Sequence, residues 1–114
     1  KRKFNIGMDK RVANLVLLRA GNYCEKCGMP CDDFALHHRK LRSQGGKDEP
    51  CNLIAVHHKC HNLGTDSIHN QPEKSRVKGW IVPSWAEPSE YPLHLVDGSV
   101  VRLDNEGNYQ SLEC

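Results

Sequence analysis

The sequence has few aromatic residues and no long apolar run. Of its 114 residues, 6% are aromatic and 38% are hydrophobic, so a core built from apolar side chains alone would be small. Small domains of this kind gain stability from a bound metal ion or from disulfides. No apolar stretch reaches the roughly 20 residues that span a bilayer, and no signal-peptide pattern is present. We therefore expect one small domain, stapled by a metal or by disulfides, that makes no contact with a membrane.

The six cysteines favour metal binding over disulfide formation. Short cysteine pairs beside histidines, without a secretion signal, are typical of metal ligands in a reducing compartment such as the cytoplasm. A Cys-x-x-Cys pair at residues 24–27 is followed by glycine, and the half-pair His-x-x-Cys lies at 57–60. This spacing predicts a tetrahedral structural Zn2+ site. Its ligands would be Cys24, Cys27, His57 and Cys60, with Cys31 as a rival fourth ligand.

Charge is distributed unevenly along the chain. Residues 1–78 hold 15 of the 16 Lys and Arg and 8 of the 14 Asp and Glu, a net charge of +7, whereas residues 79–114 carry −5. A basic body is typical of proteins that bind a polyanion, and we expect a nucleic acid as the partner. The first ten residues, KRKFNIGMDK, form a basic arm that either lies along phosphates or only keeps the terminus soluble.

Hydrophobic periodicity predicts an N-terminal helix and a hairpin. The helical pattern runs from about Asp9 to Ala20 and stops at Gly21-Asn22, a pair suited to a left-handed turn. Residues 34–38 alternate as a short strand. The apolar segment 52–56 could pair with this strand across the intervening loop.

The second half of the chain is expected to contain a broken helix and an appendage. A helix that starts at 57–61 should be interrupted at 64–66, with Asp66 or Ser67 capping a second piece that ends at Gly79. Pro72 must lie in a first turn of this piece or mark a kink. The run GWIVPSW at 79–85 is strand-like. The last 24 residues are predicted to be an acidic satellite hairpin that turns at Asp97-Gly98 and ends at a second turn over 104–107.

Histidine is concentrated in one stretch, since residues 37–69 hold six of the seven. His37 and His38 end the predicted strand, and the hairpin would bring Asn52 close to them. A basic loop around Gly45-Gly46 follows the pair and is too polar to be core. We expect this loop to contact phosphates rather than to be only an exposed turn. Its basic residues beside the pair are Arg39, Lys40 and Arg42.

The order of these elements resembles the HNH endonuclease family. His-His, a Gly-Gly loop, Asn-Leu-Ile and then x-x-Cys-His follow one another over 37–61, and the flanking cysteines are similar to its zinc-knuckle branch of phage and bacterial genomes. The resemblance implies an α+β fold: a small zinc-stapled ββα-metal domain, here with an N-terminal helix and a C-terminal β-hairpin appendage. It also implies roles by position: His38 as general base, Asn52 as the residue that orients it, and His37 and His61 as ligands of a catalytic ion.

The chain departs from the family pattern at two positions. His57 stands where the family has a cysteine, an exchange that zinc tolerates. Thr65 stands where the family has a third histidine, four residues after His61. The next histidine is His69, and eight residues of unbroken helix would rise about 12 Å. A break at Gly64 could return His69 to the site; otherwise water or substrate would complete the coordination.

The resemblance implies hydrolysis of DNA phosphodiester bonds with 5′-phosphate products. The catalytic ion would be Mg2+, Mn2+, Ni2+ or Zn2+, and histidine ligands suit the last three better. We predict a basic arm and packing helix over 1–22, a nuclease core over 23–82 and an acidic hairpin tail over 83–114. Two other interpretations stay open: a non-catalytic zinc-dependent nucleic-acid-binding module, and an adaptor that docks phage packaging proteins. A phage-encoded protein would act in the cytoplasm of a bacterial host cell.

Overall fold

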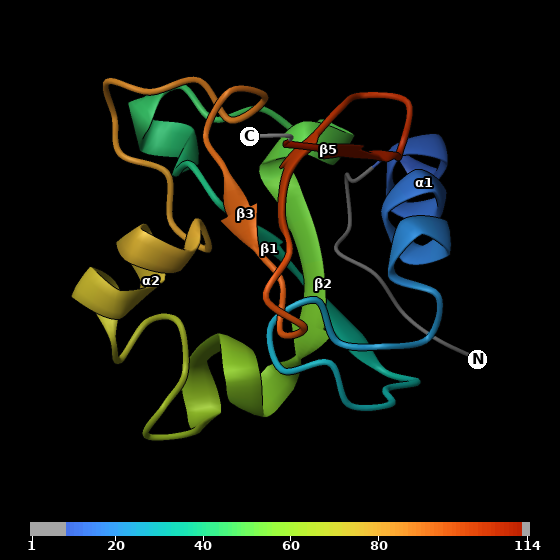
Figure 1. Cartoon of the computed structure of the whole chain (residues 1–114), viewed down its shortest axis with the longest axis vertical. Helices are drawn as coiled ribbons and strands as arrows, with labels where there is room; N and C mark the ends of the chain where they lie inside the picture. Colours follow the sequence, from blue (N-terminus) through green and yellow to red (C-terminus); the bar gives the residue numbers. More distant parts are fainter. Residues whose placement is uncertain (1–8, 113–114) are drawn as a thin grey trace.

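The computed structural model describes residues 9–112, so residues 1–8 of the predicted basic arm lie outside the described part. The chain is an α+β domain, as predicted. Residues 9–112 contain two α-helices, α1 (Lys10–Ala20) and α2 (Pro72–Lys78), and two antiparallel sheets. β1 (Phe34–His38) pairs with β2 (Leu53–His57), and a second sheet contains β3 (Leu93–His94), β4 (Val100–Leu103) and β5 (Tyr109–Ser111). Figure 1 shows α1 and α2 on opposite sides of the strands.

Helix α1 forms where the periodicity predicted it. The side chain of Asp9 accepts a hydrogen bond from the N–H of Arg11 at the start, and Gly21 ends the helix in the left-handed conformation. Val16 and Ala13 are fully buried and pack against the core. The helix therefore packs over the β1–β2 hairpin. None of its side chains belongs to a metal-ligand cluster among residues 9–112.

The β1–β2 hairpin has the predicted pairing. His37 lies opposite Ile54, and His38 lies opposite Leu53. β2 is apolar on both faces because both are covered, and Leu53 to Val56 have no exposed surface. The hairpin is thus a rigid, buried platform that carries the histidine pair at one end and His57 at the other.

The segment after β2 differs in detail from the prediction. A π-helical turn, η3 (Lys59–Leu63), replaces a regular helix and ends at Gly64. Asp66 and Ser67 do not cap a second helix: α2 starts only at Pro72, after Gln71. Proline is tolerated there because the first turn of a helix leaves its N–H groups unpaired. Gly79 ends α2 with φ of 83°, as expected.

Residues 79–85 were predicted to be strand-like, and this is wrong. The segment is irregular, and its backbone polar groups bond to residues of the core: the N–H of Val82 donates to the carbonyl oxygen of Arg39 at 2.8 Å. Prolines at 83 and 88 remove donors that a strand would need. The segment instead wraps the end of β1.

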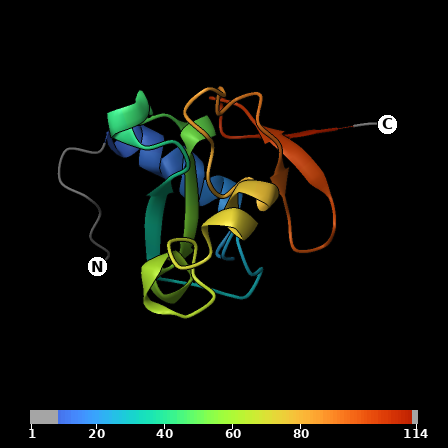
Figure 2. The same ribbon diagram turned by 90° about the vertical axis from the view of Figure 1, so that its left-hand side faces the viewer.

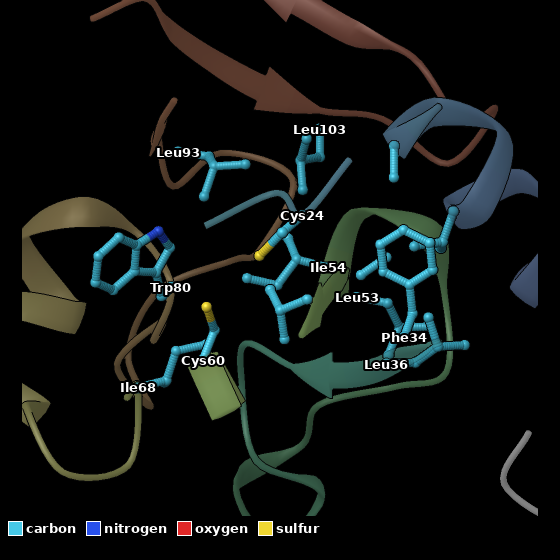
Figure 3. Close-up of a cluster of buried hydrophobic side chains, with 14 of the residues drawn as sticks. Cys24, Phe34, Leu36, Leu53, Ile54, Cys60, Ile68, Trp80, Leu93 and Leu103 are labelled. Carbon is cyan, nitrogen blue, oxygen red and sulfur yellow. The ribbon is translucent and has the colours of Figure 1, made fainter. Parts of the chain in front are cut away.

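The C-terminal region is larger and more integrated than a satellite hairpin. The turn at Asp97-Gly98 joins β3 to β4 as predicted, but the turn at 104–107 leads into a third strand, β5, rather than ending the sheet. Leu93 and Leu103 are buried in the same core cluster as Leu53. Figure 3 shows these three side chains in one cluster with Trp80 and Cys60, and Figure 2 shows the sheet and the β1–β2 hairpin on either side of α2.

A buried ion pair ties the two ends of the chain together. Arg19 contacts Glu25 through two hydrogen bonds, of 2.8 and 2.9 Å, and both side chains are almost completely buried. The hydroxyl of Tyr109 donates to the same carboxylate at 2.6 Å, and the N–H of Ala55 donates to it at 2.9 Å. Burying a charge is costly unless its hydrogen bonds are complete, and here they are. This network fixes the loop between the first two cysteines against α1, β2 and β5.

None of the helices in the described residues is long and apolar enough to cross a membrane.

Candidate functional site

The first cluster of possible metal ligands joins the loop after α1 to the end of β2. One ligand atom from each of its residues lies within 4.8 Å of the others. Nδ1 of His57 is 3.4 Å from Sγ of Cys27 and 3.8 Å from Sγ of Cys60. Its members are the four predicted residues, Cys24, Cys27, His57 and Cys60. The rival ligand Cys31 is not among them, and its thiol bonds to the carbonyl oxygen of Asp33.

Hydrogen bonds around this cluster prepare it for a cation. Nε2 of His57 lies 2.8 Å from the carbonyl oxygen of Pro30. A carbonyl only accepts, so Nε2 carries the proton and the lone pair of Nδ1 faces the sulfurs. Three backbone N–H groups, those of Lys26, Cys27 and His57, point at Sγ of Cys24.

The thiol pKa values in this cluster diverge. Burial opposes ionisation of Cys24, but the backbone donors outweigh burial and lower its pKa. Burial raises the pKa of Cys60, and the neighbouring Cys24 thiolate raises it further. A divalent cation would allow both thiols to ionise, because its charge would offset the repulsion between the two thiolates. The donor set and its hydrogen bonds are therefore compatible with a zinc ion.

The second cluster contains only histidines. His37 comes from β1, His61 from η3, and His69 from the loop before α2, and their ligand atoms lie within 4.8 Å of one another. Nε2 of His61 is 3.0 Å from Nε2 of His69. The structure thus brings together all three histidines that the resemblance made candidates for the catalytic ion.

The chain path explains how His69 reaches this cluster. After Gly64 the backbone reverses, and the N–H of Ile68 bonds to the carbonyl oxygen of Cys60 at 2.8 Å. The N–H of His69 bonds to the carbonyl oxygen of His61 at 3.2 Å. The separation of eight residues is therefore closed by a turn rather than spanned by a helix.

Burial lowers the pKa of two histidines of this cluster. Burial lowers the pKa of His37 to about 3, although the carbonyl oxygen of Trp80, 2.7 Å from Nε2, partly offsets the shift. Burial and the neighbouring His69 lower the pKa of His61 to about 4. The bond to Trp80 also places the proton of His37 on Nε2 and leaves Nδ1 as a free lone pair. Neutral imidazoles with fixed lone pairs are the form that binds metal ions.

His38 lies beside this cluster and is oriented by a residue that sequence reasoning missed. Its Nε2 is 2.6 Å from Oδ1 of Asp48, and Oδ2 of Asp48 accepts a 2.7 Å hydrogen bond from Arg42. Contact with His38 lowers the pKa of the Asp48 carboxyl, and Arg42 lowers it further. The sequence offered one signal for this contact, namely an aspartate in the loop that joins the two predicted strands.

Asn52 was predicted to orient His38, and the structure shows a different contact. Its Oδ1 accepts from the N–H of Lys40 at 2.7 Å, and its Nδ2 donates to the carbonyl oxygens of Lys40 and Lys47. Within residues 9–112 Asn52 makes no hydrogen bond to His38. Asn52 closes the loop that carries Asp48, so its influence on His38 is indirect. Gly46 is required at the same place, because a Cβ there would lie 1.9 Å from the carbonyl oxygen of Lys40.

Arg39 and Lys40 were predicted to contact phosphates, and their burial corrects this. Arg39 is only 1% exposed, and its guanidinium donates to four backbone carbonyls, at Gly79, Cys51, Pro88 and Tyr91. Burial lowers the pKa of Arg39 to about 10. Lys40 is buried too, and its Nζ donates to the carbonyl oxygen of Ala86 at 2.9 Å. Both cations hold the irregular segment 79–91 against the end of β1.

We predict that Arg39→Met destabilises the protein strongly. The substitution keeps much of the side-chain volume but leaves four carbonyl oxygens without a donor, at a cost of about 3 kcal/mol or more in the free energy of unfolding. Urea unfolding followed by circular dichroism measures this cost. Arg42→Met serves as the control because Arg42 is largely exposed, and we expect a change below about 1 kcal/mol. Equal effects of the two substitutions would contradict the structural role of Arg39.

A pocket of about 360 Å³ opens next to the histidine cluster. His37, His38 and His69 line one part of it. Segment 81–84 and residues 41 and 44 of the basic loop line other parts, and Arg76 of α2 completes the wall. The base candidate, two of the three cluster histidines and a cation therefore line one space of a size suited to a small ligand or a single nucleotide.

Comparison with known proteins agrees with this geometry. Residues 24–67 match the family model described as HNH endonuclease. This range begins at the first knuckle cysteine and includes both strands of the hairpin, His38, Asp48 and His61. Neither the curated proteins nor the solved structures contain a match to this chain. Segment 24–67 therefore matches the HNH endonuclease family that its residue pattern resembles.

Proposed function

We propose that the protein is a metal-dependent endonuclease that hydrolyses DNA phosphodiester bonds. The observation that carries this proposal is the shared pocket: His38, held by Asp48, opens into the same space as His37 and His69. HNH domains are typically nucleases, and segment 24–67 matches that family. The net charge of +2 and the basic first two thirds of the chain suit a polyanionic substrate.

His38 would act as the general base through Nδ1. The Asp48 carboxylate accepts from Nε2, so in the neutral imidazole the proton stays on Nε2 and Nδ1 is free to take a proton from water. The resulting imidazolium is stabilised by the same carboxylate, while Arg42 holds that carboxylate in place. Asp48 would thus align His38 as an acidic partner aligns a catalytic histidine, a role that we had expected for Asn52.

His37, His61 and His69 would hold the catalytic ion. Three imidazoles whose ligand atoms lie within 4.8 Å of one another fit a divalent metal, and three protein ligands leave coordination positions open. When bound, such an ion supplies neutralisation of charge on the phosphoryl oxygens and on the leaving 3′ oxygen. All-nitrogen ligation favours Zn2+, Ni2+ or Mn2+ over Mg2+. The expected products carry 5′-phosphates.

The first cluster, of three cysteines and His57, has a separate, structural role in this proposal. Cys24, Cys27, His57 and Cys60 would together supply the four ligands that a structural zinc ion needs, which would leave no coordination site for substrate. Lys26, between the two cysteines, places its ammonium 4.5 Å from the ring centroid of Trp80, whose carbonyl orients His37. The loop between Cys24 and Cys27 thereby contacts Trp80, the residue whose carbonyl oxygen orients His37.

The test of this function is His38→Ala in a cleavage assay. We expect cleavage of supercoiled plasmid to slow by about 10²- to 10⁴-fold, the usual contribution of a general base. His58→Ala is the matched control, because His58 belongs to neither cluster and its ring is half-exposed. A His38→Ala variant that cleaves as fast as wild type with its fold intact would remove the assignment.

Asp48→Asn should lower activity by at least about tenfold without unfolding the protein. The amide can donate to Nε2, which would move the proton of His38 to Nδ1 and block the base, and it also loses the charge that stabilises the imidazolium. Initial rates of plasmid nicking measure the effect. Asp33→Asn is the control, because Asp33 is exposed and lies near His58 instead. Unchanged rates in Asp48→Asn would mean that the contact with His38 has no part in catalysis.

The alternative of a non-catalytic binding module was favoured by Thr65. His69 lies where the missing ligand is needed, which supports the enzyme over that alternative. A role with phage packaging proteins and action in a host cytoplasm stay predictions from the resemblance.

A further inference from the structure

The cations around the pocket differ in whether they are free to bind substrate. Arg39 and Lys40 are buried and donate to backbone carbonyls. Arg42 is engaged by Asp48. Arg76 lines the pocket, is exposed, and makes neither an ion pair nor a side-chain hydrogen bond with any residue in 9–112. Among the cations that line the pocket or adjoin His38 in the described chain, Arg76 alone offers an uncommitted guanidinium.

Arg76 is carried by a helix that is anchored to the histidine cluster. The buried hydroxyl of Ser75, its neighbour in α2, lies 3.0 Å from the carbonyl oxygen of Ile68, one residue before His69, and 2.7 Å from that of Gln71. On the other side, the hydroxyl of Tyr91 donates to the carbonyl oxygen of Arg76 itself at 3.0 Å. The backbone beneath the guanidinium is therefore fixed relative to His69, which a side chain needs if it is to meet a reacting group.

We propose that Arg76 binds a non-bridging oxygen of the scissile phosphate. This inference rests on the proposed nuclease function, and it names the side chain that would bind the substrate phosphate in the pocket. A guanidinium matches two phosphate oxygens at once and keeps its charge at any working pH. Ile81, Val82 and Pro83 line the same pocket, and their apolar surface strengthens an ion pair by excluding water.

Arg76 would complement the metal-binding histidines. Negative charge grows on the equatorial oxygens as the diester is attacked, so a cation placed in advance stabilises the transition state. Of the three loop cations predicted to contact phosphates, Arg39 and Lys40 are buried and Arg42 is paired with Asp48. The structure thereby shifts phosphate binding from the loop after β1 to the exposed face of α2.

The experiment compares Arg76→Ala and Arg76→Lys with Lys78→Ala, using the full chain. Lys78 lies on the same helix, and its loss changes net charge equally, but it does not line the pocket. Two substrates are used: plasmid DNA and bis(p-nitrophenyl) phosphate, which contains one phosphodiester and no flanking phosphates. A second measurement is DNA affinity by fluorescence anisotropy, made in a His38→Ala background so that no cleavage occurs.

We expect Arg76→Ala to lower kcat/KM by about 10- to 100-fold on both substrates, as for loss of a charge-assisted contact. Arg76→Lys should recover part of the loss, Lys78→Ala should stay within about twofold of wild type, and DNA affinity should fall more for Arg76→Ala than for Lys78→Ala. All variants should melt like wild type, since the Arg76 side chain makes no ion pair or hydrogen bond within residues 9–112 that could be lost.

Three results would overturn the inference. A loss on DNA but not on the small diester would place Arg76 at a flanking phosphate instead. Equal effects of Arg76→Ala and Lys78→Ala would reduce its role to general charge. A wild-type protein that is inert on both substrates would instead remove the nuclease function itself, and the inference with it.

Discussion

Cys27→Ser is expected to abolish the cooperative unfolding transition and to release zinc. The sulfur of Cys27 is 3.4 Å from Nδ1 of His57, at the centre of the knuckle cluster. A structural zinc ion contributes on the order of 10 kcal/mol, which is comparable to the whole net stability of a small domain. This loss should be larger than for any other single substitution considered above, because the core has few large apolar side chains to compensate.

Metal content by mass spectrometry and thermal melting by circular dichroism test this prediction together. Cys31→Ser is the control: the chemical change is the same, and Cys31 is buried nearby but lies outside the cluster. The control should keep its zinc and melt cooperatively. A Cys27→Ser protein with an unchanged melt and a full zinc complement would refute the structural zinc site.

His61→Ala should leave the protein folded but inactive. Substitutions of groups that merely orient a metal ligand cost 10- to 100-fold in metal affinity or activity, so loss of the ligand itself should cost at least about 100-fold. His61 is only partly buried, and its ring meets His69 and His37 rather than the apolar core. We therefore expect little change in the melting temperature.

Plasmid cleavage, metal affinity and thermal melting of His61→Ala measure these three effects. His94→Ala is the control, since His94 is a partly exposed residue of β3 and belongs to neither cluster. Simultaneous loss of fold and activity in His61→Ala would show that the histidine cluster is structural too. Retained activity would exclude His61 from the site.

The residue pattern predicted those parts of the molecule that depend on local signals. Helix α1 has a capping aspartate, an apolar face and a glycine stop, all within 13 residues of one another in the sequence. The β1–β2 hairpin follows from alternation on one strand and apolarity on the other. The cysteine cluster could be anticipated because ligand spacing is fixed by the geometry of a turn around one ion. The histidine cluster was anticipated from the family resemblance.

The residue pattern gave a wrong prediction where a charged side chain forms hydrogen bonds with backbone groups far away in the sequence. Arg39 reads as an exposed loop residue, since nothing near it in the sequence indicates the four carbonyls that accept from it. Three of them lie 40 to 52 residues further along, in or beside a segment without regular structure. Asp48 escaped notice for a related reason: its role depends on how Asn52 and Gly46 fold the loop back toward His38.

The acidic net charge of the tail was a poor guide to how much of it is buried. Residues 79–114 are acidic overall, yet Leu93, Val101 and Leu103 face the common core while the charged side chains point outward. A three-stranded sheet with one buried face needs only every second residue to be apolar. Net charge therefore said little about whether the tail is a separate unit.

The central claim is that a divalent ion at the histidine cluster, separate from the knuckle zinc, is required for phosphodiester hydrolysis. The most direct test is nicking of supercoiled plasmid by protein stripped of loosely bound metal, with Mg2+, Mn2+, Ni2+ or Zn2+ returned one at a time, beside His61→Ala. We predict no cleavage before metal is returned, cleavage with at least one of the ions, and none in the variant. No cleavage with any ion, from folded protein that retains one tight zinc, would contradict the account.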